Sequence, residues 1–164
     1  MRIRMISGIT LVALLTFSVW AQQGARGQAQ EQAGPQAASI ITASEVAAMI
    51  TKSPADRNAL GQRLLRLGTY SVNMEHRVAG QGASVHEKEA ELFYVIEGSG
   101  TLVTGGKLVE EKRTNPTNLS GTSIEGGVTR TISKGDWVMV PEGVPHQIPA
   151  VQGALTVMSM HLPR

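Results

Sequence analysis

Short β-strand candidates separated by turn residues fill the sequence from residue 64 onward, and this pattern constrains the fold more than any other feature. Apolar residues alternate with polar ones at period two in the first candidate, through Leu64, Tyr70, Val72 and Met74. Further candidates lie at residues 91–97, 100–104, 130–133, 136–140 and 155–162, and Gly-containing turns separate several of them. Many short strands divided by Gly and Pro indicate a sandwich or barrel rather than an alternating α/β fold. We therefore predict an all-β domain over residues 63–164.

Two segments depart from the strand pattern. Residues 105–127 are rich in Gly, Asn, Pro and Ser, and we predict that they form the longest loop. Within an N-terminal helical segment at residues 39–62, a helix is predicted from Thr42 to about Thr51, because Thr42 and Glu45 have the spacing of a capping box. Three residues at helical spacing give this helix an apolar face: Val46, Met49 and Ile50. We expect that face to pack on the barrel or on a partner subunit.

The N-terminal residues have the features of an export signal. A basic start with Arg2 and Arg4 precedes an apolar run at residues 5–20, and Ala21 is small enough for a signal peptidase. A retained membrane anchor is the alternative, but Ser, Thr and Gly interrupt the run, and a stable span usually needs about 20 predominantly apolar residues. We predict a signal peptide at residues 1–21, a flexible Gln-, Ala- and Gly-rich linker at 22–38, a periplasmic or secreted protein, and no stable membrane anchor after cleavage.

Charge and cysteine content restrict the possible partners. The chain has 15 Lys and Arg against 13 Asp and Glu, and loss of Arg2 and Arg4 with the signal peptide would leave the two signs balanced. No basic cluster then remains that could follow a phosphate backbone, so nucleic acid is not an expected partner. The chain contains no cysteine, and therefore any bound metal ion must be held by nitrogen and oxygen ligands.

The strongest motif lies at residues 135–146, with the sequence Gly-Asp-Trp-Val-Met-Val-Pro-Glu-Gly-Val-Pro-His. Gly135 opens a strand after a tight turn, Pro141 ends it, and His146 begins the next strand with its ring pointing inward. This stretch resembles the second motif of the cupins, whose Gly, Pro, Gly and His recur at these spacings. Ala150 departs from the pattern, since an Asn often stands there.

A second motif lies upstream, at residues 82–98. It resembles the first cupin motif, in which two His one residue apart are followed by Glu and then by Gly. His86, Glu91 and Gly98 match this pattern, whereas Ser84 occupies the position of the first His. The resemblance extends from about residue 64 to 162 and is closest to small single-domain bacterial cupins of the conserved-barrel type, called cupin 2. It implies a double-stranded β-helix, also called a jelly-roll barrel, with a short N-terminal helix.

The resemblance also implies a metal site formed by His86, Glu91 and His146. Two imidazoles and one carboxylate suit a divalent ion such as Fe(II) or Mn(II), and less selectively Zn(II) or Ni(II), and they leave positions open for a ligand. Strand parity supports the site, since Glu91, Phe93 and Val95 share one strand face and would point inward together. The alternative is a metal-free pocket in which the two His donate hydrogen bonds.

Four other side chains are weaker candidates. His76 continues the face of Tyr70, Val72 and Met74, and we therefore expect it, rather than His161, to be a fourth ligand if there is one. A lone His on an apolar face is nevertheless more often a core residue than a ligand. For Arg77 and Arg130 we expect surface ion pairs, and orientation of an anionic substrate is the alternative.

Three functions stay open at this point. The chain could be a metal-dependent enzyme acting on a small organic molecule by oxygenase, isomerase, lyase or decarboxylase chemistry. It could instead be a non-catalytic module that binds a small ligand or a metal. A purely structural barrel is disfavoured, because inward His and Glu cost stability unless a partner satisfies them. Residues 92–96 are apolar on both strand faces, with Tyr94 and Ile96 facing outward, and this indicates a possible homodimer through a buried sheet or strand exchange.

Overall fold

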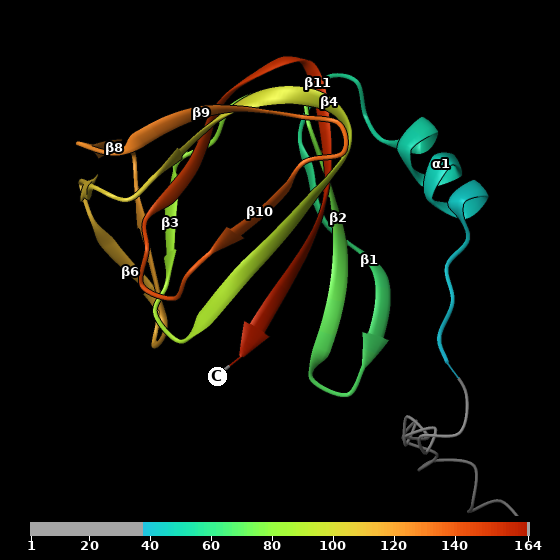
Figure 1. Ribbon diagram of the computed structural model, residues 1–164, viewed down its shortest axis with the longest axis horizontal. Coiled ribbons are helices and arrows are strands. Elements are labelled where there is room, and N and C mark those ends of the chain that lie inside the picture. The colour runs from blue at the N-terminus through green and yellow to red at the C-terminus, as the bar shows by residue number, and fades with distance from the viewer. Residues whose placement is uncertain (1–37, 164) are drawn as a thin grey trace, which may run out of the picture. The chain divides into compact units, whose positions relative to one another are not determined.

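The computed structural model describes residues 38–163, which contain one helix, α1 (Ala43–Lys52), followed by eleven strands (Figure 1). The predicted signal peptide at residues 1–21 and nearly all of the predicted linker at 22–38 lie outside the described residues. Between residues 38 and 163, no helix has the length and apolar character needed to cross a membrane.

Helix α1 begins with the capping box that the sequence predicts. The backbone N–H of Glu45 donates to Thr42 Oγ1 at 3.3 Å, and the backbone N–H of Thr42 donates to Glu45 Oε2 at 2.7 Å. No residue of α1 is fully buried, but Val46, Met49 and Ile50, the three residues of its predicted apolar face, are partly buried, whereas its other residues are exposed. Packing of this face on the barrel or on a partner subunit stays a prediction.

The strands form one nine-stranded sheet and one two-stranded sheet, and all their pairings are antiparallel. Their bounds are β1 (Ala59–Leu67), β2 (Tyr70–Arg77), β3 (Ala83–His86), β4 (Glu89–Thr104), β5 (Lys107–Val109), β6 (Lys112–Asn115), β7 (Asn118–Gly121), β8 (Ser123–Glu125), β9 (Val128–Ser133), β10 (Trp137–Val140) and β11 (His146–Pro163). Along the large sheet the order is β1-β2-β11-β3-β7-β6, while β4 pairs with β11, β10 and β9. The chain thus adopts the jelly-roll barrel expected from its strand pattern.

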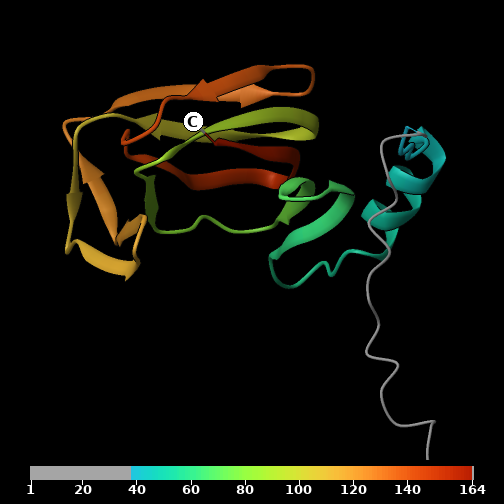
Figure 2. The ribbon, with the colours of Figure 1, turned by 90° about the horizontal axis from the view of Figure 1, so that it is seen from below.

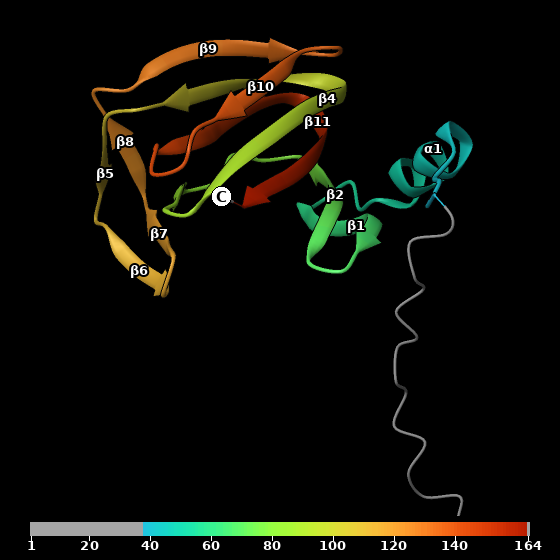
Figure 3. The same cartoon turned by 60° about the horizontal axis from the view of Figure 1, so that its bottom comes forward.

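The two longest strands, β4 and β11, run together through both halves of the barrel (Figures 2 and 3). Both bend where their register shifts, near Gly98 on β4 and between Gln152 and Leu155 on β11. Gly98 has a φ of +79°, and a Cβ at this residue would lie 1.9 Å from the carbonyl oxygen of Ala154. Only glycine fits this bend, which folds the sheet over to close the barrel.

An apolar cluster fills much of the barrel and is contributed mainly by β4, β9, β10 and β11. Its buried members are Phe93, Val95, Leu102, Ile132, Val140, Ile148, Leu155 and Val157. Burying each of the larger side chains stabilises the fold by about 1.5–3 kcal/mol. Along β4 the residues Glu91, Phe93 and Val95 are all buried, which confirms the predicted strand parity.

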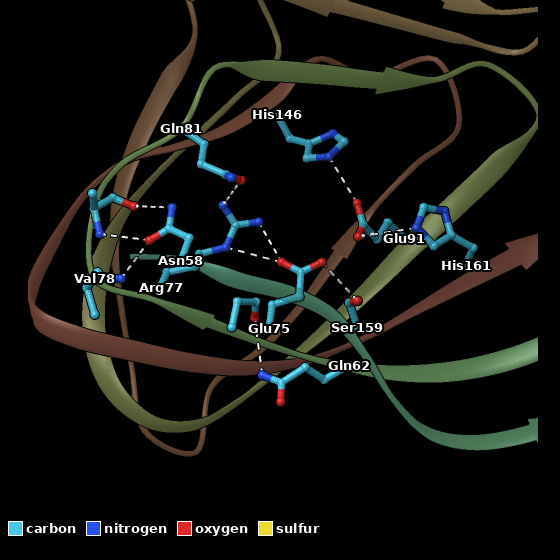
Figure 4. Close-up of polar contacts among 12 residues, drawn as sticks. Asn58, Gln62, Glu75, Arg77, Val78, Gln81, Glu91, His146, Ser159 and His161 are labelled. Atoms are coloured by element: carbon cyan, nitrogen blue, oxygen red, sulfur yellow. Dashed lines mark hydrogen bonds and ion pairs between the residues drawn. The ribbon is translucent and has the colours of Figure 1, made fainter. Parts of the chain in front are cut away.

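A buried ion pair lies on the inner face of β2 (Figure 4). Arg77 donates from Nη2 to Glu75 Oε2 at 2.5 Å and from Nη1 to Gln81 Oε1 at 2.6 Å. The hydroxyl of Ser159 donates to the other oxygen of Glu75 at 3.2 Å. Arg77 is 9% exposed, so the expected surface ion pair is wrong: the pair exists, but inside the barrel.

Residues 105–127 differ from their prediction as the longest loop. They contain the four short strands β5 to β8, each of three or four residues. All four residues of Lys112–Asn115 are exposed, and so they lack the apolar alternation by which a strand is identified from sequence. Strand β1 begins at Ala59, four residues ahead of the predicted start of the barrel domain at residue 63.

Candidate metal centre

Three His and one Glu from β3, β4 and β11 converge inside the barrel. His86 ends β3, Glu91 lies near the start of β4, and β11 begins with His146 and carries His161 near its end. The Nε2 atoms of His146 and His86 lie 3.0 and 3.3 Å from Glu91 Oε2. On the other side of this carboxylate, His161 Nε2 lies 3.6 Å from Oε1 (Figure 4). The structure thus brings the predicted residues His86, Glu91 and His146 together.

His161 belongs to this cluster, and the expectation that His76 would be the fourth ligand is wrong. The ligand atoms of His86, Glu91 and His161 all lie within 4.8 Å of one another. His76 is on the opposite face of the sheet, where its Nδ1 lies 2.9 Å from the hydroxyl of Thr156. The β2 pattern separates two faces correctly, but its polar face, which carries Glu75, turns inward. The apolar side, which predicted His76 inside the barrel, is the outer one.

Hydrogen bonds fix the tautomer of the His146 ring. Its Nδ1 lies 3.2 Å from the backbone carbonyl oxygen of Val144, which can only accept, so Nδ1 carries a hydrogen. His86 Nδ1 has a similar partner, the side-chain oxygen of Asn118 at 3.2 Å. In the neutral rings both Nε2 lone pairs would then face the Glu91 carboxylate, which is repulsive. Either protons on Nε2 or a metal cation between these atoms removes the repulsion.

The same contacts shift the ionisation of the cluster. Burial acts to raise the pKa of Glu91, but hydrogen bonds and attraction from the neighbouring His side chains outweigh it and lower this pKa from 4.5 to about 2. Burial acts to lower the pKa of His86, but the hydrogen bond and charge of Glu91 outweigh it, and the pKa is raised above 6.5. The carboxylate therefore stays ionised at neutral pH, as a metal ligand must.

One buried nitrogen in the cluster has no hydrogen-bond partner among the described residues. This atom is His161 Nδ1, which lies 3.2 Å from Glu89 Oε2 but without hydrogen-bond geometry. The buried nitrogen lacks a hydrogen bond although two carboxylates lie beside the ring. A cation bound by the ring, together with a small ring rotation, would allow that hydrogen bond to form. The residues therefore fit a metal ion, both in donor type and in their unsatisfied atoms.

Two polar neighbours are not ligand candidates. Ser84 lies on β3 opposite His146, and its position is the one at which the first cupin motif has a His. Glu87 forms an ion pair with Arg113 at 2.7 Å on the surface. The carboxylate of Glu89 is different, because it lies beside His161.

Sequence comparison agrees with the fold and the motifs. A family model described as Cupin matches residues 43–161. The chain belongs to the cupin family. Its finer assignment to the small conserved-barrel group stays a prediction, and no curated protein matches the chain.

Solved cupin-like structures resemble this cupin in fold. The cupin domain of Cnp3 from Schizosaccharomyces pombe is 11% identical, with a TM-score of 0.50 over 70% of this chain and 67% of that one. The protein TT1209 from Thermus thermophilus is 14% identical, with a TM-score of 0.49 over 72% of this chain and 94% of that one. Fe(II) HppE is 14% identical, with a TM-score of 0.47 over 65% of this chain and half of that one. At such identities the likeness concerns the fold alone.

Proposed function

We propose that this cupin binds one divalent transition-metal ion through His86, Glu91 and His146, and that a small organic molecule binds or reacts there. The observation that carries the proposal is the pair of Nε2 atoms at 3.0 and 3.3 Å from one Glu91 oxygen, with both Nδ1 atoms held by acceptors. Two imidazoles and a carboxylate suit Fe, Mn, Zn or Ni ions, and a bound ion would supply a Lewis acid with open positions.

The chain's own residues prepare this chemistry. Val144 and Asn118 orient the two rings, and Glu91 keeps its negative charge at neutral pH. The apolar cluster beside the site, which includes Phe93 at a ring distance of 6.1 Å from His146, limits access of water. We propose oxygenase, isomerase or lyase-type chemistry as the reaction class.

A non-catalytic module that binds a small ligand or a metal is the second candidate. Ser84 and Ala150 favour this candidate. Each stands where the family motifs have a His or an Asn, so this chain has fewer groups that could form the site. Turnover separates the two candidates. A metal-binding protein that binds one of a panel of small organic molecules but leaves all of them chemically unchanged would be a binding module.

The test compares wild-type protein with His146→Ala and with His76→Gln, a control outside the site. Purified proteins are loaded with Fe(II), Mn(II), Zn(II) or Ni(II), and bound metal is measured after gel filtration. We expect about one ion per wild-type chain and per His76→Gln chain, and strong loss in His146→Ala. Equal metal retention in His146→Ala, or none in the wild type, would refute the proposed site.

We further propose export, with cleavage after Ala21. The basic start and the apolar run at residues 5–20 support it. Amino-terminal sequencing of protein expressed from the full chain in a bacterial host tests this. A periplasmic or secreted product beginning at Gln22 is expected, and a product that keeps residues 1–21 in the cytoplasm would contradict it.

We also propose a homodimer through the outer face of the barrel sheet. Paired residues of β10, β4, β11 and β2 place two apolar rows there: Met139, Leu92, Met160 and Val72, and Trp137, Tyr94 and Met158. Met74, which continues the second row on β2, is buried within the chain itself. Trp137 is 61% and Met139 54% exposed, whereas the outer face of an antiparallel sheet is usually polar. A second copy fits best, because an uncharged apolar face is complementary to itself.

Light scattering tests this association. A dimeric mass is expected for the wild type and a monomeric mass for Trp137→Glu combined with Met139→Glu. The exposed residue Val128 on β9 supplies the control, since Val128→Glu changes apolar surface outside these two rows. A monomeric wild type would contradict the proposal.

A further inference from the structure

We infer that His161 supplies the metal ligand that Ser84 does not, and that Glu89 orients its ring. This inference rests on the proposed metal site. In the first cupin motif the third imidazole would come from β3, two residues before His86. In this chain it comes instead from the far end of β11, which reaches the same place by pairing with the start of β4.

The register of the strands explains how two distant histidines of one strand meet. His146 at the start of β11 pairs with Ser84 on β3, and His161 near its end pairs with Glu91 on β4. The bend of β11 returns its end to the barrel interior. The His161 ring packs edge-on against the His86 ring, with a centroid distance of 4.4 Å and an interplanar angle of 82°.

The three imidazoles share one arrangement around Glu91. In each ring Nε2 faces the Glu91 carboxylate, at 3.0 Å for His146, 3.3 Å for His86 and 3.6 Å for His161. In each ring Nδ1 faces an oxygen acceptor: the Val144 carbonyl, the Asn118 amide and the Glu89 carboxylate, respectively. A ligand His typically donates its second nitrogen in this way.

His161 differs from the other two rings in one respect, which points to a ligand. Its buried Nδ1 is 3.2 Å from Glu89 Oε2 without forming a hydrogen bond. A hydrogen bond from this N–H to Glu89 would satisfy Nδ1 and would leave Nε2 as the atom that could hold an ion. A divalent first-row transition metal is the ligand class, because the set becomes three imidazoles and one carboxylate.

A rescue experiment tests this inference. Ser84 and His86 share one face of β3, so a His at residue 84 would point toward the site. Co(II) alone is the probe: its affinity is measured by titration against a competing chelator, and its coordination by visible absorption. We expect His161→Gln to weaken Co(II) binding by at least about tenfold and to change the spectrum.

Ser84→His combined with His161→Gln should restore both affinity and spectrum, while His76→Gln should leave both unchanged. Glu89→Gln should weaken binding by about tenfold with little change in the spectrum, as expected for a positioning residue. Thermal melts verify that each variant is folded. Wild-type affinity and spectrum in folded His161→Gln would overturn the inference, whereas absence of Co(II) binding by wild type would overturn the proposed metal site itself.

Discussion

The free energy of unfolding should fall as the pH rises above 6.5 in the metal-free protein, but should increase with pH up to neutrality in the metal-loaded protein. In the metal-free protein the Glu91 carboxylate is held by protonated His, and its pKa falls from 4.5 to about 2. Its stabilisation is therefore fully present above pH 4.5 and is lost as the pH falls through about 2. The pKa of His86 is raised above 6.5, so its stabilisation is present below pH 6.5 and is lost as the pH rises through the folded value.

The contribution of Glu91 to the free energy of unfolding follows from the shift of its pKa. A change from 4.5 to about 2 at 1.36 kcal/mol per pH unit corresponds to roughly 3 kcal/mol. Glu91 is 4% exposed, so solvent screens this interaction little. The ion pair with His86 is the same interaction seen from its other partner, and the two contributions are not added.

Urea unfolding of chelator-treated protein from pH 3 to 9 measures this effect. We expect highest stability between pH 4.5 and 6.5, with a decline above pH 6.5. Zn(II)-loaded protein should instead gain stability as the pH rises to neutrality, because protons then compete less with the ion for the imidazoles. Glu91→Gln isolates the contribution of the site from that of other carboxylates. A metal-free profile that runs parallel in wild type and Glu91→Gln would refute the reasoning.

Three further substitutions have expected outcomes. Gly98→Ala should destabilise the protein by roughly 2–5 kcal/mol, because the added Cβ clashes with the backbone and the residue has a positive φ. Gly105→Ala should cost about 1–2 kcal/mol, because this residue has a positive φ but open space around it. Denaturant unfolding measures both. Glu75→Gln leaves the Arg77 guanidinium buried without its carboxylate and should cost about 3–5 kcal/mol in the same assay. Asn118→Ala removes the acceptor behind His86 and should weaken Co(II) affinity about tenfold in a competition titration.

The barrel and the convergence of His86, Glu91 and His146 could be predicted from sequence because their signals are local. The Glu91, Phe93 and Val95 alternation gives the inner face of β4 directly, and the resemblance to the two cupin motifs gives His86 and His146. The capping box of Thr42 and Glu45 likewise lies within one helical turn.

Other features depend on tertiary structure and could not be read from local pattern. Period-two alternation on β2 separates His76 from Glu75 but does not tell which face turns inward, since here the polar face is the inner one and the apolar face is the outer one. His161 reaches the site only through its register opposite Glu91, at the far end of a strand that begins with His146. Its spacing from Ser159 and Val157 on one face of β11 indicates the inner face, but only the strand register places it beside Glu91.

The metal content of purified full-length protein tests the central claim most directly. Protein from medium supplemented with Fe, Mn, Zn and Ni salts is analysed by elemental mass spectrometry, alongside a variant that carries both His146→Ala and Glu91→Gln. We expect about one divalent ion per wild-type chain and almost none in the variant. Metal-free wild-type protein that also fails to take up any of these ions on titration would contradict the account.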